Sequence, residues 1–311
     1  MTATRHPFRF GVHTGRSTSL AAWQETARRA EGLGYSILTV ADHFGDQLSY
    51  APALLAAALA TTTLRIGTLV LDNDFRHPAL VAADAATLDL LSEGRFELGI
   101  GAGWMAEDYA WSGIPFDPPK VRVDRLIESV AIIKGLLAGQ PVTLSGLHYT
   151  VADLPGYSGT VQRPHPPLLI GAGGRRMLAL AAREADIVSI LPQALPQGGL
   201  ALAELTAGRI GEKAAYVRQM AAGRAASPEV NILLQALAIT ADWRSHADEI
   251  GRRWHLSADE VRDSPTALLG TVEDLAETLL ARREHFGISY IAIRESDMER
   301  FAPVVARLAG T

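Results

Sequence analysis

The first clear structural pattern lies in residues 64–101, LRIGTLVLDNDFRHPALVAADAATLDLLSEGRFELGIG. Apolar runs without polar alternation, at Leu64–Leu71 and Phe96–Gly101, are typical of strands buried on both faces. Between them, Pro78–Leu91 has apolar residues at helical spacing, and its first residue is a proline, which suits the start of a helix. Strand, helix and strand in this order predict two parallel strands joined by a crossover helix.

The same alternation continues on both sides of this stretch. Further strands are expected at Phe8–Thr14, Tyr35–Val40, Leu168–Ala172, Asp186–Leu191, Val230–Thr240 and Ser289–Ile293. Further helices are expected at Leu20–Leu33, Pro52–Thr61 and Val121–Ala138. Eight strands alternating with helices favour a closed (β/α)8 TIM barrel over an open sheet, and 311 residues suit a barrel that forms one domain over residues 1–311.

Two segments interrupt the alternation and are expected to be insertions. Pro141–Val151 is typical of a β-hairpin placed after the fourth helix. Pro192–Gly208 contains proline and glycine and is expected to form a lid-like loop over the site. Neither segment has the composition of a domain linker.

Composition narrows the classes of partner. A net charge of −5 and a pI near 6.0 argue against a nucleic-acid binder, which needs a basic surface. The sequence has no cysteine, which excludes disulfides and thiolate zinc sites and is compatible with a cytoplasmic setting. No apolar segment follows the basic residues of the first twelve positions, and Ala51–Ala60 is too short to span a bilayer. We therefore expect no leader and no membrane partner.

Polar residues gather after the predicted strands, where a barrel of this kind builds its active site. They are His13 and Thr14; Asp42 and His43; Asp72, Asn73, Asp74, Arg76 and His77; Trp104 and Glu107; and Gly171–Arg176. The acidic residues Asp74 and Asp84 do not have the spacing of metal ligands, so no metal is expected. His77 with Pro78 is expected to open a helix.

His43 is the first candidate for proton transfer. It follows a buried strand directly, and a histidine there can donate or accept a proton near neutral pH. A histidine hydrogen-bonded into the rim of the barrel fits the same position equally well. Asp42 is expected to orient its neighbours or cap a helix rather than to react.

Two glycine-rich segments follow predicted strands. Gly171–Arg176 lies between a strand and a helix beginning near Met177, so its bare amides and two arginines would suit phosphate oxygens. A tight turn with solvated arginines explains the same residues equally well. Gly99, Gly101 and Gly103 are expected to allow close approach of a flat ring or of neighbouring backbone. The aromatic residues Trp104, Tyr109 and Trp111 are expected to serve packing.

Several long segments, in order, show that the chain resembles the bacterial luciferase-like monooxygenase superfamily, particularly the branch that uses the deazaflavin coenzyme F420. They are AEGLGYSILTVADHF (residues 30–44), GTLVLDNDFRHP (67–78), DLLSEGRFELGIGAGW (89–104), RPHPPLLIGAGGRRMLALAAREADIV (163–188), GTVEDLAETL (270–279) and FGISYI (286–291). The resemblance covers nearly the whole chain. It implies a barrel whose strand ends hold F420 or, alternatively, FMN.

The resemblance also assigns roles to residues. His43 matches the active-site histidine of F420-dependent dehydrogenases and reductases, and Gly173 and Gly174 match amides that meet the cofactor phosphate. A non-prolyl cis peptide that backs the ring is expected between Leu69 and Val70. The full set expected to bind the cofactor is His13, Asp42, Leu69, Val70, Gly103, Gly171, Ala172, Gly173, Gly174, Arg175 and Arg176.

Two departures bear on the substrate. Gln47 stands where sugar-phosphate dehydrogenases of this group have a tryptophan, and Trp104 replaces their carboxylate. A sugar phosphate is therefore not expected. The expected activity is hydride transfer between F420 and a small organic substrate, with His43 moving the proton. An oxygen-activating two-component FMN monooxygenase and a non-catalytic ligand-binding barrel are the alternatives. The resemblance also implies a homodimer, formed through helices near the second to fourth strands.

Overall fold

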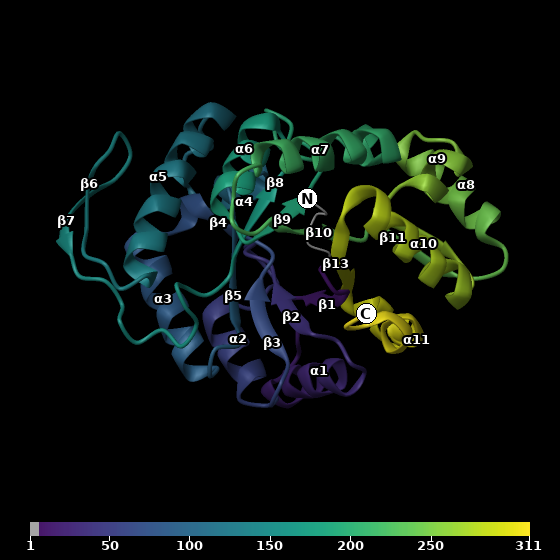
Figure 1. The fold of residues 1–311 in the computed structure, drawn as a ribbon, viewed down its shortest axis with the longest axis horizontal. Coiled ribbons are helices and arrows are strands. Elements are labelled where there is room, and N and C mark those ends of the chain that lie inside the picture. Colours follow the sequence, from purple (N-terminus) through teal and green to yellow (C-terminus); the bar gives the residue numbers. More distant parts are fainter. Residues whose placement is uncertain (1–5) are drawn as a thin grey trace.

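The computed structural model describes residues 6–311, and Figure 1 shows its strands gathered at the centre with helices around them. The central strands are β1 (Arg9–Thr14), β2 (Ile37–Val40), β3 (Arg65–Thr68), β4 (Leu71–Asp72), β5 (Phe96–Gly101), β8 (Leu168–Ala172), β9 (Ile187–Ile190), β10 (Glu229–Leu233) and β13 (Ile288–Arg294). Most of their residues are buried, as expected for strands covered on both faces.

The central sheet closes on itself. Its strands follow the order β3-β2-β1-β13-β10-β9-β8-β5-β4, and β3 also pairs with β5. The strands β3 and β4 follow each other along the chain and both pair with β5, so together they occupy one strand position. The nine strands therefore fill eight positions in the barrel. Each pairing within the ring is parallel. The predicted (β/α)8 TIM barrel is therefore confirmed.

The helices lie outside the ring, although not all of them pack on it. They are α1 (Leu20–Gly32), α2 (Tyr50–Ala58), α3 (Pro78–Leu91), α4 (Ala106–Ser112), α5 (Pro119–Leu137), α6 (Arg175–Glu184), α7 (Ala207–Met220), α8 (Trp243–Trp254), α9 (Ala258–Asp263), α10 (Val272–Phe286) and α11 (Met298–Leu308). The helix α3 has the predicted bounds, and the His77 ring caps it by accepting a hydrogen bond from the Ala79 amide. Within residues 6–311, no helix combines the length and apolarity needed to cross a membrane.

The predicted hairpin after α5 is confirmed. Strands β6 (Val142–Ser145) and β7 (Thr150–Leu154) pair antiparallel, and Figure 1 shows them at the outer edge of the molecule beside α5. The Glu128 carboxylate on α5 accepts hydrogen bonds from the amides of Leu147, His148 and Tyr149. This carboxylate therefore satisfies the exposed amides of the hairpin turn and fixes it to the barrel.

The prediction of one strand over Val230–Thr240 was wrong. The barrel strand β10 ends at Leu233, and the following strand β11 (Ala236–Ile239) pairs with β12 (Ala267–Gly270) in a separate two-stranded sheet. The Gln235 amide bonds to the Thr266 carbonyl, which redirects the chain away from the barrel. A continuous apolar run shows that a segment is buried but does not show where its pairing partner changes.

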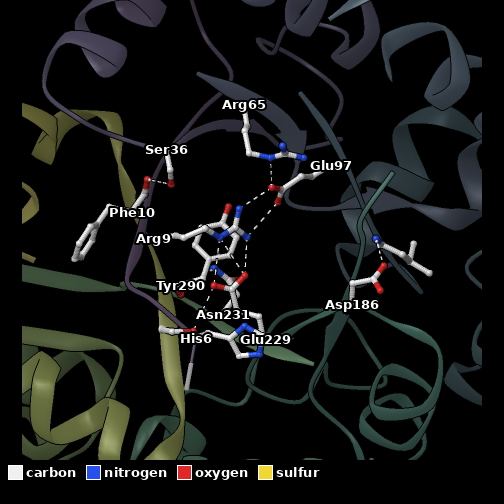
Figure 2. Close-up of polar contacts among 12 residues, drawn as sticks. His6, Arg9, Phe10, Ser36, Arg65, Glu97, Asp186, Glu229, Asn231 and Tyr290 are labelled. Atoms are coloured by element: carbon white, nitrogen blue, oxygen red, sulfur yellow. Dashed lines mark hydrogen bonds and ion pairs between the residues drawn. The ribbon is translucent and has the colours of Figure 1, made fainter. Parts of the chain in front are cut away.

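Charged residues close the barrel at the amino-terminal ends of its strands (Figure 2). Arg9 bonds to Glu97 at 2.6 Å and to Glu229 at 2.7 Å, and Arg65 bonds to Glu97 at 2.5 Å. Burial opposes the charge on Arg9, but Glu97 and Glu229 raise the pKa of its guanidinium overall. We call Arg9, Arg65, Glu97 and Glu229 the base network. It fills this end, so the opposite end is the one open to ligands.

Candidate functional site

A cavity of about 920 Å³ opens at the carboxyl ends of the barrel strands. Its volume lies within the range of small-molecule sites. Of the residues predicted to bind the cofactor or to transfer a proton, those that line this cavity are His13, Asp42, His43, Leu69, Val70, Gly103, Gly171, Gly173, Gly174, Arg175 and Arg176. Ala172 does not line it, because it is fully buried in the hydrophobic core. We call this space the mouth cavity.

His43 is held by a carboxylate. Its Nδ1 lies 2.6 Å from Oδ2 of Asp108, whose Oδ1 accepts a hydrogen bond from the Phe44 amide at 3.0 Å. Asp108 is only 2% exposed, so the carboxylate is fixed in place. Trp104 meets the His43 ring edge-on, with centroids 5.8 Å apart. Because Nδ1 faces Asp108, Nε2 is the nitrogen left to face a ligand.

Asp108 was missed at the sequence level. The prediction named its neighbour Glu107, which is exposed and lies outside the cavity lining. The residues that follow β5 form α4, whose buried side carries Asp108 and Tyr109. An acidic residue beside a buried aromatic on a short helix after a strand end was the available signal.

The other cavity acids already have partners. Asp42 accepts two hydrogen bonds from Arg76, at 2.6 and 2.9 Å, and one from the Asp72 amide, contacts that fit the expected orienting role. Asp72 accepts hydrogen bonds from the Tyr109 hydroxyl at 3.0 Å and the Asp74 amide at 2.9 Å. Burial raises the pKa of the Asp72 carboxyl to about 7, and the nearby charge of Asp74 acts in the same direction.

His13 differs from His43 in its surroundings. Its Nδ1 lies 3.2 Å from the Thr39 hydroxyl, and within residues 6–311 it has no carboxylate at ion-pair distance. Burial lowers the pKa of His13 to about 4, and positive charge on Arg294 and His43 adds to the effect. His13 is therefore neutral at physiological pH.

The cavity wall between β3 and β4 has the predicted irregularity. The peptide between Leu69 and Val70 is cis, and both residues line the cavity. A Cβ at Gly99 would lie 2.0 Å from the Thr68 carbonyl oxygen, and one at Gly101 would lie 3.0 Å from a Val70 methyl. Glycines on β5 thus make room for the neighbouring backbone, which was one of the two predicted explanations.

The helix α6 opens on the cavity with bare amides. Its N-cap residue is Gly174, which makes no side-chain cap bond. A Cβ at Gly173 would lie 2.4 Å from the Pro192 carbonyl oxygen, so this turn requires glycine. The arginines that follow have protein partners, since Arg175 stacks 4.5 Å from the Tyr216 ring and Arg176 bonds to Asp124 at 2.5 Å. The amides of the first turn are the groups that suit an anion.

The predicted lid-like segment borders the cavity. Ala194 and Leu200 form an isolated antiparallel bridge, and both line the cavity. The base of this segment is fixed by Glu204, which accepts from the Gln193 amide and from the Lys213 ammonium group, each at 2.8 Å. Gly198, at the far end, lies against Ala106 of α4.

Comparisons with known proteins identify relatives. A family model described as luciferase-like monooxygenase matches residues 2–285. The chain is 36% identical over 167 residues to the F420-dependent glucose-6-phosphate dehydrogenase of Beutenbergia cavernae. The aligned region covers 50% of this chain and 48% of that protein. It is 38% identical over 136 residues to the 4-hydroxyprotoasukamycin monooxygenase of Streptomyces nodosus subsp. asukaensis, which covers 42% of this chain and 36% of that protein.

These matches thus span about half of the first curated relative and about a third of the second. Among solved structures, the coenzyme F420 dependent tetrahydromethanopterin reductase from Methanopyrus kandleri shares the fold. Its structure superposes with a TM-score of 0.77 at 17% identity, over 97% of this chain and 100% of that one.

Proposed function

Because this chain belongs to the luciferase-like monooxygenase family, we propose that it is an oxidoreductase that uses coenzyme F420 to exchange a hydride with a small organic substrate. The observation that supports the proposal most strongly is that one cavity contains both the His43–Asp108 pair and the uncapped amides at the start of α6. The similarity to an F420-dependent dehydrogenase supports the choice of cofactor.

The residues of the mouth cavity fit such a cofactor. The amides of Gly174 and the first turn of α6 would hold an anionic tail. Gly101 and Gly103 present no side chain, and with Leu69 and Val70 they would border a flat ring. A Cβ at Gly103 would lie 1.9 Å from the Tyr109 hydroxyl oxygen, so glycine is needed there.

When bound, F420 supplies the carbon that carries the hydride. The protein supplies the proton route and the orientation. Asp108 accepts a hydrogen bond from Nδ1–H of His43 and fixes the ring, so that Nε2 can give a proton to the substrate or take one from it. Asp108 also stabilises the imidazolium that proton uptake creates. The segment that carries Ala194 and Leu200 limits the access of water.

Cofactor titrations test the proposal. Purified protein should bind F420, seen as a difference absorbance spectrum, more tightly than FMN, and it should consume no oxygen when supplied with reduced FMN. The similarity to a monooxygenase favours FMN-dependent oxygen activation as the second candidate. Tight FMN binding with oxygen uptake would replace the first candidate by the second, and binding of neither cofactor would reject both.

We also propose a cytoplasmic homodimer. Large apolar side chains are exposed on the adjacent helices α2, α3 and α5. They are Leu59, which directly follows α2, Leu80, Leu90 and Leu91 on α3, and Ile127 on α5. Several apolar side chains exposed on neighbouring helices are typical of a self-association surface. Sedimentation of wild type and Leu80→Glu tests this, because the charge should shift a dimer toward monomer, and a monomeric wild type would contradict it. The absence of cysteine from the sequence is compatible with the proposed cytoplasmic setting.

A further inference from the structure

Arg294 is the last residue of β13; it is exposed to solvent and lies at the rim of the mouth cavity, which it helps to line. Strands β1 and β13 are in register, with Arg9 beside Tyr290, Gly11 beside Ala292 and His13 beside Arg294. Side chains alternate between the two faces of a strand, so these three pairs share one face. Figure 2 shows Arg9 and Tyr290 in the barrel interior, where Arg9 reaches carboxylates on two other strands. The pair His13 and Arg294 therefore faces the mouth cavity, which both residues line.

The Arg294 guanidinium is not neutralised by the protein. Within residues 6–311, no carboxylate lies at ion-pair distance from it and no hydrogen bond engages it. The adjacent Glu295 is engaged by the hydroxyl groups of Thr14 and Thr26. The acids of the cavity wall are also engaged, Asp42 by Arg76 and Asp108 by His43. A free cation thus faces a cavity whose acids are occupied.

This cation is distinct from the anion site at α6. In the ring of strands, β13 is separated from β8, which leads into α6, by β10 and β9. Lys120 and Arg122 also line the cavity, with the Arg122 guanidinium stacked 3.9 Å from the Phe116 ring, so the start of α6 and Arg294 are two of several positive groups around it. The cofactor tail in the proposed function would use the start of α6. Arg294 remains for a second ligand.

We propose that Arg294 binds a carboxylate group of the substrate, which makes the substrate an organic acid whose reacting carbon lies within reach of His43. The inference rests on the proposed function for the identity of the reaction. A planar guanidinium matches a carboxylate through two parallel hydrogen bonds. One guanidinium balances one negative charge. A phosphate dianion would need a second cation, and the neighbouring His13 is neutral at physiological pH.

The test uses pairs of probes that differ only in charge. Acetate, crotonate, benzoate and cinnamate, each with its amide, are titrated into F420-loaded protein and into apoprotein by calorimetry. At least one acid should bind wild type about 10- to 100-fold more tightly than its amide, and Arg294→Gln should remove that preference while amide binding is unchanged. Arg252→Gln, an exposed arginine on α8 outside the cavity, is the matched control and should behave as wild type.

Three results would contradict the proposed role of Arg294 or the proposed charge of the substrate. If no acid is preferred over its amide in wild type, or if Arg294→Gln keeps the preference, Arg294 does not bind a carboxylate. Phenyl phosphate binding more tightly than benzoate, with the same loss in Arg294→Gln, would contradict the match to a single charge. F420 affinity is measured separately and should be equal in wild type and Arg294→Gln. If wild type fails to bind F420, the proposed function fails, but the acid preference of the apoprotein still decides the role of Arg294.

Discussion

Two histidines of the mouth cavity differ in the groups that hold them. His43 has a buried carboxylate at 2.6 Å, whereas His13 has only a hydroxyl at 3.2 Å. A carboxylate partner stabilises an imidazolium, and a hydroxyl group does so far less. The burial of His13 works against its protonation. Under the proposed function, these surroundings favour His43 for proton transfer and a neutral, positioning role for His13.

The orientation of His43 should depend on Asp108. In Asp108→Asn, Oδ1 can still accept from the Phe44 amide, which turns the new amide nitrogen toward Nδ1. Nδ1 must then accept, so the neutral ring should carry its proton on Nε2 rather than Nδ1. Nitrogen-15 NMR of the imidazole measures this tautomer, and the stability loss should be about 1–2 kcal/mol. Glu107→Gln is the control, and an unchanged tautomer in Asp108→Asn would remove the orienting role.

Asp72 should make stability depend on pH. Its folded pKa of about 7 lies above the ordinary value, so the neutral carboxyl contributes stability that is complete in acid and is lost as pH rises through about 7. Asparagine resembles the neutral form at every pH. Asp72→Asn should therefore be more stable than wild type at pH 8, by about 1–3 kcal/mol after allowance for partial exposure, and nearly equal at pH 4.

Urea unfolding at pH 8 and at pH 4 measures the effect of Asp72→Asn on the free energy of unfolding. Asp46→Asn, at an exposed position, is the control and should show no such dependence. A destabilised Asp72→Asn at pH 8 would mean that the fold does not raise the pKa of the wild-type carboxyl, and would contradict this prediction.

At the scale of elements, the two ends of the strands serve different purposes. The amino-terminal ends carry the base network, in which every carboxylate meets a guanidinium. The carboxyl-terminal ends carry loops with glycines and with groups that remain open to a ligand, such as the amides of α6. Stability and binding are thus placed at opposite ends of the same strands, as is usual in this fold.

The base network should be needed for stability. Arg9→Met leaves Glu229 without its cation and Glu97 with only Arg65, and both carboxylates are nearly buried. The expected loss is about 3–5 kcal/mol in the free energy of unfolding at pH 7. The loss should shrink as pH falls and the carboxylates protonate. Arg209→Met removes an exposed surface pair and should change stability little, so equal effects of the two substitutions would contradict this account.

The start of α6 should control cofactor affinity. Gly174 has φ −89° and ψ 160°, and a Cβ there would come no closer than 3.9 Å to a neighbour, so other residues fit. Aspartate would cap the helix and place a negative charge on the amides that suit an anion. Gly174→Asp should therefore bind F420 at least about 10-fold more weakly without loss of thermal stability. Gly174→Ala should bind as wild type, and equal affinity in both variants would exclude this anion site.

Sequence patterns predicted the elements well and the site in part. The alternation of buried strands and helices fixed the barrel, because both faces of its strands must be apolar, and the bounds of α3 were correct. The departure of β11 from the barrel was missed, because an apolar run does not identify its partner. Asp108 was missed although it follows a strand end beside an aromatic residue, because its contact with His43 joins positions 65 residues apart in the sequence. Arg294 was not singled out, because a sequence does not show whether a charged side chain finds a carboxylate partner in the fold.

At the scale of the whole molecule, closure of the ring brings all these groups together. Residues from the first strand to the last meet around one cavity of about 920 Å³, with the base network closing the other end. Three groups of the cavity follow different strands of that ring. The amides of α6 follow β8, the His43–Asp108 pair joins segments after β2 and β5, and Arg294 ends β13. In the proposed function, the cavity therefore has separate places for the cofactor tail, the residue that moves the proton and the substrate anion.

A crystal structure of the protein with F420 tests this assignment most directly. The tail phosphate should lie on the amides of Gly174 and the first turn of α6, the flat ring should lie against Leu69 and Val70, and the Arg294 guanidinium should be free of the cofactor. A complex in which the phosphate lies on Arg294, or in which the ring lies outside the mouth cavity, would contradict it.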